Sequence, residues 1–92
     1  MFHNLSMLNV SIYPNPFANQ TLISYFIPVS SRVVLSVVNS RGEEISRFEA
    51  MEQDAGHYEF EFNARDLPSG IYFCNIETNN YSETKKLILI TD

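Results

Sequence analysis

Hydrophobic and polar side chains alternate in short stretches along the chain, and turn-forming Pro, Gly, Asn and Ser residues separate one stretch from the next. This spacing is typical of an antiparallel β-sandwich or barrel, in which each strand is short and each connection is tight. The pattern predicts seven strands, at residues 10–13, 20–27, 33–39, 43–50, 57–63, 71–78 and 81–90.

The alternation also predicts how two of these strands pack. In 57–63, the aromatic residues Tyr58, Phe60 and Phe62 share one face and the other face is polar. We expect the aromatic face to pack on the core and the polar face to contact water. Stretch 33–39 is apolar on both faces, which predicts a strand in the centre of a sheet.

Stretch 43–50 alternates less regularly than the others. Ile45 and Phe48 are three residues apart, so both can turn inward only if the strand contains an irregularity such as a bulge. We expect that arrangement here. The polar residues 51–56 that follow are predicted to form a loop.

Proline and glycine residues mark the turns. Pro14 and Pro16 end the first strand, because each proline fixes φ and lacks the N–H that a strand ladder needs. Phe17, directly after them, is expected to cap one open end of the sandwich as a core residue. Gly42 closes the turn at 39–42, where it supplies a positive φ.

A second turn precedes the sixth strand, where Leu67, Gly70 and Tyr72 form a Leu-x-x-Gly-x-Tyr sequence. This sequence resembles the tyrosine corner of immunoglobulin-like sandwiches, in which the ring is buried and its hydroxyl bonds to backbone upstream. Tyr72, Cys74 and Ile76 are then the inward positions. The predicted fold is an all-β, seven-stranded, immunoglobulin-like antiparallel β-sandwich.

Composition supports this class and excludes others. Val, Ile, Thr, Tyr and Phe fill 30 of the 92 positions against 11 for Ala and Leu, which excludes an all-helical fold. The 45% hydrophobic fraction argues against disorder, and the apolar run 87–90 is too short to cross a membrane. A net charge of -5 repels phosphate, so no nucleic-acid partner is expected. The single Cys74 cannot form an intramolecular disulfide.

The sequence offers few groups for catalysis, and we predict that the protein is not an enzyme. His3 and His57 are expected on the surface, and Cys74 is expected in the core with no basic neighbour to activate it. Glu59 and Glu61 share a face as paired carboxylates could, but charge on an exposed sheet face ordinarily serves solubility. A small hydrolase built on that pair is the least favoured interpretation.

The sequence predicts neither a metal centre nor a cofactor. No His-x-x-x-His or Cys-x-x-Cys pair occurs, and the three glycines are too far apart to form a phosphate loop. Glu52 and Asp54 could contribute to a calcium loop, but they lack the Asp-x-Asp-x-Asp-Gly spacing of such sites.

Four segments occur together in a recognisable order. They are Pro-Asn-Pro-Phe at 14–17, Asn-Ser-Arg-Gly at 39–42, the run from Leu67 to Phe73, and Thr-Lys-Lys-Leu-Ile at 84–88. With this set, residues 10–90 resemble the C-terminal sorting domain of the type IX (Por) secretion system of Bacteroidetes.

The resemblance implies a non-catalytic domain at the carboxyl end of a larger cargo protein in the same chain. It implies partners in the type IX machinery, namely the outer-membrane translocon and surface processing proteins. The cargo would be secreted or attached to the cell surface, by way of the periplasm and outer membrane. On this interpretation, residues 10–92 are the sorting domain and residues 1–9 are a linker or tag remnant.

The resemblance also assigns residues to two roles. Scaffold positions are Pro14, Pro16, Phe17, Gly42, Gly70 and Tyr72. Recognition positions are Lys85, Lys86, Leu87, Ile88, Leu89 and Ile90.

We expect the last strand to lie at a sheet edge, where unpaired backbone groups can accept a partner strand. Lys85 and Lys86 could protect this edge from aggregation, contact an acidic groove on the translocon, or do both. The exposed strand could also mediate a homodimer.

A second function remains open at this point. The same fold could serve as a fibronectin-III-like adhesion or carbohydrate-binding module, with Tyr25, Phe73 or Tyr81 exposed and stacking on sugar rings. Such a module would keep its function without its last six residues, whereas a sorting signal would lose it.

Overall fold

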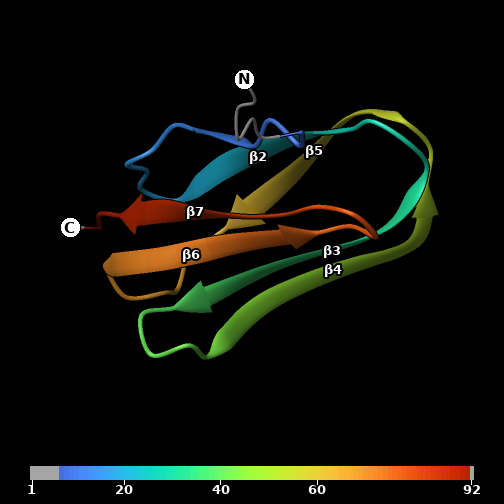
Figure 1. The fold of residues 1–92 in the computed structure, drawn as a ribbon. Coiled ribbons are helices and arrows are strands. Elements are labelled where there is room, and N and C mark those ends of the chain that lie inside the picture. Colours follow the sequence, from blue (N-terminus) through green and yellow to red (C-terminus); the bar gives the residue numbers. More distant parts are fainter. Residues whose placement is uncertain (1–6, 92) are drawn as a thin grey trace, which may run out of the picture.

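Seven β-strands make up the regular structure of residues 7–91, which are the residues that the computed structural model describes (Figure 1). None of these residues belongs to a helix that could cross a membrane. The strands are β1 (Ser11–Tyr13), β2 (Gln20–Ile27), β3 (Ser31–Asn39), β4 (Glu44–Gln53), β5 (Gly56–Asn63), β6 (Gly70–Glu77) and β7 (Ser82–Leu89).

The strands form two antiparallel sheets, with the orders β1-β2-β5 and β4-β3-β6-β7. The sheets pack face to face as two layers, so the predicted seven-stranded sandwich is confirmed (Figure 1). Strand β3 lies between β4 and β6, as its two apolar faces predicted. Strand β7 is at the outer end of the larger sheet, next to β6.

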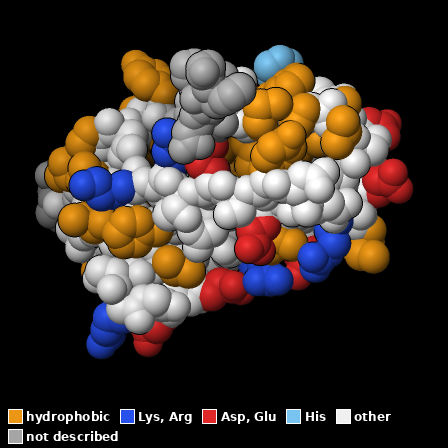
Figure 2. All heavy atoms as spheres, in the orientation of Figure 1, with side chains coloured by type: hydrophobic (Ala, Val, Ile, Leu, Met, Phe, Trp, Pro, Cys, Tyr) orange, Lys and Arg blue, Asp and Glu red, His pale blue; other side chains and the backbone are white. Residues whose placement is uncertain are grey.

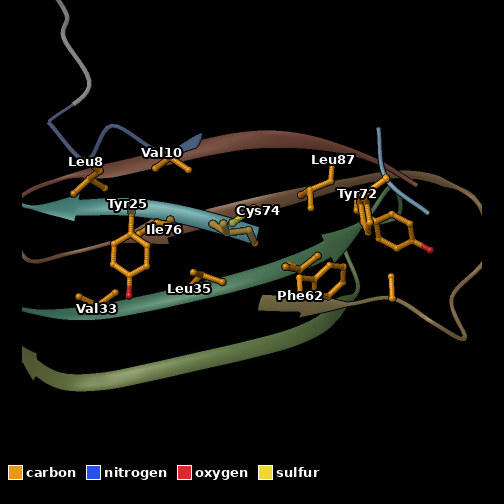
Figure 3. Close-up of a cluster of buried hydrophobic side chains, with 14 of the residues drawn as sticks. Leu8, Val10, Tyr25, Val33, Leu35, Phe62, Tyr72, Cys74, Ile76 and Leu87 are labelled. Atoms are coloured by element: carbon orange, nitrogen blue, oxygen red, sulfur yellow. The ribbon is translucent and has the colours of Figure 1, made fainter. Parts of the chain in front are cut away.

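The core lies between the two sheets and is built from the alternate, inward residues of both. Figure 3 shows Tyr25 of β2 and Phe62 of β5 on the side facing Leu35, Cys74 and Leu87 of the larger sheet. Full burial of one such large apolar side chain stabilises a fold by about 1.5–3 kcal/mol. The inward positions of β6 and β7 therefore fix both strands against the smaller sheet.

The irregularity predicted in β4 is present, but one of the two side chains expected in the core is exposed. The β3–β4 register shifts by one residue between Val37 and Val38, and Ile45 is the residue left without a partner across the ladder. Ile45 is 36% exposed and lies outside the buried core, although it lines a surface hollow with Phe60 and Phe62 of β5, so the prediction that it is buried in the core is wrong. Phe48 does turn inward, and its ring centroid lies 5.8 Å from that of Phe60.

Strand β4 also runs further than predicted. It continues to Gln53, so most of the loop expected at 51–56 is strand. The Tyr25 hydroxyl donates a hydrogen bond to Gln53 Oε1 at 3.0 Å, which connects the end of β4 to the smaller sheet. The ladder with β3 also extends this far, since Gln53 is paired with Ser31.

The packed region begins before β1. Leu8 is 1% exposed, and its carbonyl accepts a 2.7 Å hydrogen bond from the backbone N–H of Phe26. Leu8 therefore contributes to the core, although the sequence assigned it to the linker at 1–9. Residues 1–6 of that linker, including His3, lie outside the described residues.

Candidate functional site

The segment from Lys85 to Ile90, near the end of the chain, has one side packed on the core and one side, the displayed side, on the outer face of its sheet. Leu87 and Leu89 are buried in the core. Lys86, Ile88 and Ile90 alternate with them and lie on the outer face of the larger sheet, where Ile90 is 55% exposed. The alternation of a β-strand thus fixes the segment through two leucines and leaves the other set available for contact.

The two adjacent lysines point to opposite sides of β7. Lys85 lies on the side that also carries Leu87, and its Nζ is 3.4 Å from Glu83 Oε2. Lys86 lies on the outer face, in register with Phe73 of β6. The sequence-based prediction assigned the two lysines a common role, but the strand places their side chains on opposite sides.

The outer edge of β7 is covered over its last residues. The backbone N–H of Phe17 donates to the Ile88 carbonyl, and the Ile90 N–H donates to the Phe17 carbonyl, each at 2.9 Å. The Asn15 side chain donates from Nδ2 to the Lys86 carbonyl at 2.8 Å, and its Oδ1 accepts from the Ile88 N–H at 2.9 Å. The prediction of an open edge is therefore wrong for residues 86–90.

We call residues 14–17 the clamp segment. The buried Thr21 hydroxyl donates to the Pro14 carbonyl at 2.6 Å, and both prolines of the segment are exposed, each after a cis peptide bond. Phe17 is buried as predicted, with its ring edge-on to Phe62 at 6.2 Å between centroids. Sequence reasoning identified the prolines and Phe17 but missed the asparagine between the prolines, whose amide contacts β7.

The predicted tyrosine corner is present at the start of β6. Tyr72 is 4% exposed, and its hydroxyl donates to the Pro68 carbonyl at 2.6 Å. Gly70 has a φ of +155°, a conformation that L side chains rarely adopt. Just beyond, the Thr91 N–H donates to Ser69 Oγ at 3.0 Å and ties the chain after β7 to this turn.

The turn between β3 and β4 is organised around one asparagine. Asn39 Oδ1 accepts the backbone N–H groups of Arg41 and Glu43, both at 2.9 Å. Gly42 has a φ of +85° and donates its N–H to the Asn39 carbonyl at 2.9 Å. The predicted positive φ at Gly42 is thus confirmed, and its role in the fold is to shape this turn.

The groups considered for catalysis are divided between the core, which holds Cys74, and the exposed face of β5, which carries His57, Glu59 and Glu61. Burial raises the pKa of the Cys74 thiol to about 12, which keeps it protonated and unreactive. His57 is exposed and its ring lies 4.9 Å from that of Phe26, while Glu59 and Glu61 are exposed on β5. Residues 7–91 contain no group of three or more His, Cys, Asp or Glu that could hold a metal ion.

The aromatic residues proposed for sugar stacking do not form a common surface. Tyr25 is buried, 3% exposed, and this burial raises the pKa of its hydroxyl. Tyr81 is half-buried and packs against the core, whereas Phe73 lies on the outer face of the larger sheet. The expectation that Tyr25 is exposed is therefore wrong.

Comparison with known proteins shows which family shares this arrangement. A family model described as the secretion system C-terminal sorting domain matches residues 11–90. The chain belongs to this family. No curated protein matches the chain.

The sorting domain also resembles two solved structures in its fold. One is PorU from Porphyromonas gingivalis in its dimeric latent form, with a TM-score of 0.65 and 15% identity over 90% of this chain and 9% of that one. The other is FlgD from P. aeruginosa, with a TM-score of 0.56 and 22% identity over 92% of this chain and 74% of that one. The present chain thus spans a small part of the length of PorU.

Membership gives the chain its function as a non-catalytic type IX sorting signal. Such a domain interacts with the type IX secretion machinery, and the cargo that it directs is part of the same polypeptide. The sorting signal leads to export across the outer membrane, to the cell surface or the medium.

Proposed function

We propose that the machinery recognises the sorting domain through the displayed side of its last segment, Lys85–Ile90, held on the folded sandwich. The observation that carries this proposal is the alternation of buried and exposed side chains along the segment. Leu87 and Leu89 are buried, while Lys86, Ile88 and Ile90 are presented on one face. A rigid strand presents these side chains at fixed spacing, so a partner binds them without paying the entropy of ordering a flexible tail.

Two further parts of the proposal concern the limits of the domain and its chemistry. We assign the sorting function to the unit that was predicted at 10–92, with Leu8 added because it packs in the core. The unit itself performs no catalysis and requires no cofactor. The buried, protonated Cys74 and the exposure of Glu59 and Glu61 to solvent on β5 support this assignment.

A homodimer through an exposed strand would not use the last part of β7. Asn15 and Phe17 already occupy the backbone groups of that edge from Lys86 to Ile90. Strand β4 is the other outer strand of the same sheet, and we place any pairing between two copies there. Sedimentation of the purified chain, with and without a proline in place of Glu49 on β4, tests this placement.

The experiment that tests the sorting proposal uses the full chain fused behind a periplasm-directed reporter in a Bacteroidetes host. We expect the fused reporter to reach the cell surface or medium. Replacing Lys85 and Lys86 together by alanine should increase the fraction retained in the periplasm, because the change removes Lys86 from the displayed side, and both lysines are exposed, so the core stays intact. Normal export of the double variant would contradict the proposed role of this segment.

The same host distinguishes the carbohydrate-binding alternative. A sugar-binding module has no reason to change the location of its reporter, so it would leave the fusion in the periplasm. A sugar-binding assay of the purified chain completes the comparison, with no binding expected because Tyr25 is buried in the core and Tyr81 packs against it.

A further inference from the structure

An apolar patch lies on the outer face of the larger sheet at the end where β7 finishes. In the strand registers, Val38 of β3 is opposite Phe73 of β6, and Phe73 is opposite Lys86 of β7. Ile71 of β6 is opposite Ile88 of β7 in the next row. Figure 2 shows hydrophobic side chains gathered over this end of β6 and β7, with a Lys or Arg side chain among them. We call these five residues the outer patch.

The outer patch differs from the rest of the same sheet face. Toward the other end of β6 and β7 the face is polar, with a 2.7 Å hydrogen bond between Thr84 Oγ1 and Asn75 Oδ1. On β4, Arg47 donates to both Glu44 and Glu49, and its bond to Glu49 holds the pKa of that carboxyl below its usual range. Polar groups there are satisfied within the domain, whereas Ile71 is left 45% exposed in the patch.

The charge within the patch is also unmatched. Four of the six basic residues form ion pairs with glutamates, and among residues 7–91 only Arg65 and Lys86 form none. Lys86 is therefore a free cation bordered by Phe73 and Ile88 in a chain of net charge -5. A cation at an apolar surface is complementary to a partner that offers apolar side chains around a carboxylate.

The backbone edge beside the patch is not available for the same purpose. The clamp segment already pairs with Lys86–Ile90, so a partner strand could be added there only after the clamp segment is displaced. Side chains on the face need no such displacement. Contact with this end of the domain is consequently favoured through the face of the sheet over its edge.

From these observations, and resting on the proposed function, we propose that the outer patch docks face-on against a protein surface of the secretion machinery that is apolar and presents a carboxylate to Lys86. The patch supplies the apolar contact and Lys86 supplies the charge pair. Exposed apolar clusters of this kind, with a polar surround, are characteristic of protein interaction sites. Lys85 takes no part in the contact, because it points to the other side of β7 and pairs with Glu83.

The test compares matched variants of the full chain, fused behind the periplasm-directed reporter. Lys86→Glu and Ile71→Thr alter the outer patch. Lys85→Glu makes the same charge change on the opposite side of β7, and Leu22→Thr alters a half-buried residue on the outer face of β2. Urea unfolding of each purified chain verifies that it is folded. Lys86→Gln removes only the charge of an exposed side chain, so it still tests the outer patch if the Ile71 variant unfolds, and we expect it to slow export as well.

We expect Lys86→Glu and Ile71→Thr to slow export about tenfold, the effect of about 1.4 kcal/mol of lost binding. Lys86→Arg, Lys85→Glu and Leu22→Thr should export like the wild-type chain. If folded Lys86→Glu and Ile71→Thr are exported at the wild-type rate while the unaltered fusion is also exported, the docking proposal is wrong and the sorting function is unaffected. A loss with Lys85→Glu equal to that with Lys86→Glu would overturn it too. Failure of the unaltered fusion to be exported would instead refute the sorting proposal, and the docking face with it.

Discussion

The contact of Asn15 with β7 gives the most direct prediction about stability. Asn15→Ala removes two hydrogen bonds, one of 2.8 Å to the Lys86 carbonyl and one of 2.9 Å from the Ile88 N–H. A hydrogen bond contributes about 0.5–1.5 kcal/mol net, so the pair contributes about 1–3 kcal/mol. Because Asn15 is exposed and water replaces part of this, we expect the free energy of unfolding to fall by about 1–2 kcal/mol.

Asn15→Asp separates the two bonds. The carboxylate still accepts from the Ile88 N–H, but it places a second oxygen against the Lys86 carbonyl where an N–H donated. We expect this variant to be destabilised at least as much as the alanine variant. Asn19→Ala is the control, because Asn19 is an exposed asparagine of the same connection, between β1 and β2.

Urea unfolding measures the change, and amide hydrogen exchange locates it. In Asn15→Ala the Ile88 N–H loses its acceptor and should exchange faster, whereas the Ile90 N–H keeps its bond to the Phe17 carbonyl and should change less. An unchanged urea midpoint together with unchanged exchange at Ile88 would refute the clamp and, with it, the covered edge of β7.

Three further predictions concern the fold. Tyr72→Phe leaves the Pro68 carbonyl without its donor and should lower the free energy of unfolding by about 0.5–1.5 kcal/mol, while Tyr13→Phe at an 81% exposed position should leave it unchanged in the same urea titration. A Cβ added at Gly70 meets no atom within 4 Å, so the cost of Gly70→Ala, about 1–3 kcal/mol, comes from the backbone at φ +155°, and wild-type stability would contradict that conformation. The pKa of Cys74 rises from 9.0 to about 12 on folding, so the folded state binds the proton more tightly and the free energy of unfolding should decrease from about pH 9 to about pH 12. Cys74→Ala should flatten that decrease in urea titrations across this range, and an unaltered slope would assign it to other groups.

Much of the fold could be predicted because strand alternation is a local property. Seven stretches with period two gave seven strands, and the two apolar faces of 33–39 placed β3 inside its sheet. The turn at Gly42 and the corner at Tyr72 followed from residues whose geometry is restricted by their own chemistry. Local rules sufficed wherever the determining contacts were close in sequence.

The wrong predictions have different physical origins. Tyr25 shares the inward face of β2 with Ile23 and Ile27, so consistent use of the alternation would have placed it in the core. The exposure of Ile45 could not be predicted in this way, because which residue a bulge leaves unpaired depends on the register with β3.

The covered edge of β7 depends on contacts across most of the chain. Asn15 and Ile88 are 73 positions apart, and no local pattern in either segment announces their pairing. The placement of Lys85 and Lys86 on opposite faces could, in contrast, have been predicted from the sequence, since neighbouring residues of a strand point to opposite faces.

The pairing of Phe17 with Leu89 is parallel, and it joins a segment near the beginning of the chain to the last strand. When two parallel segments are pulled from opposite ends of a chain, their hydrogen bonds are loaded together in shear and do not open one after another. Tension between the cargo and the carboxyl end would therefore be resisted by all the bonds of this junction at once. We therefore expect the sandwich to keep its fold under such tension better than it would if these bonds opened one at a time.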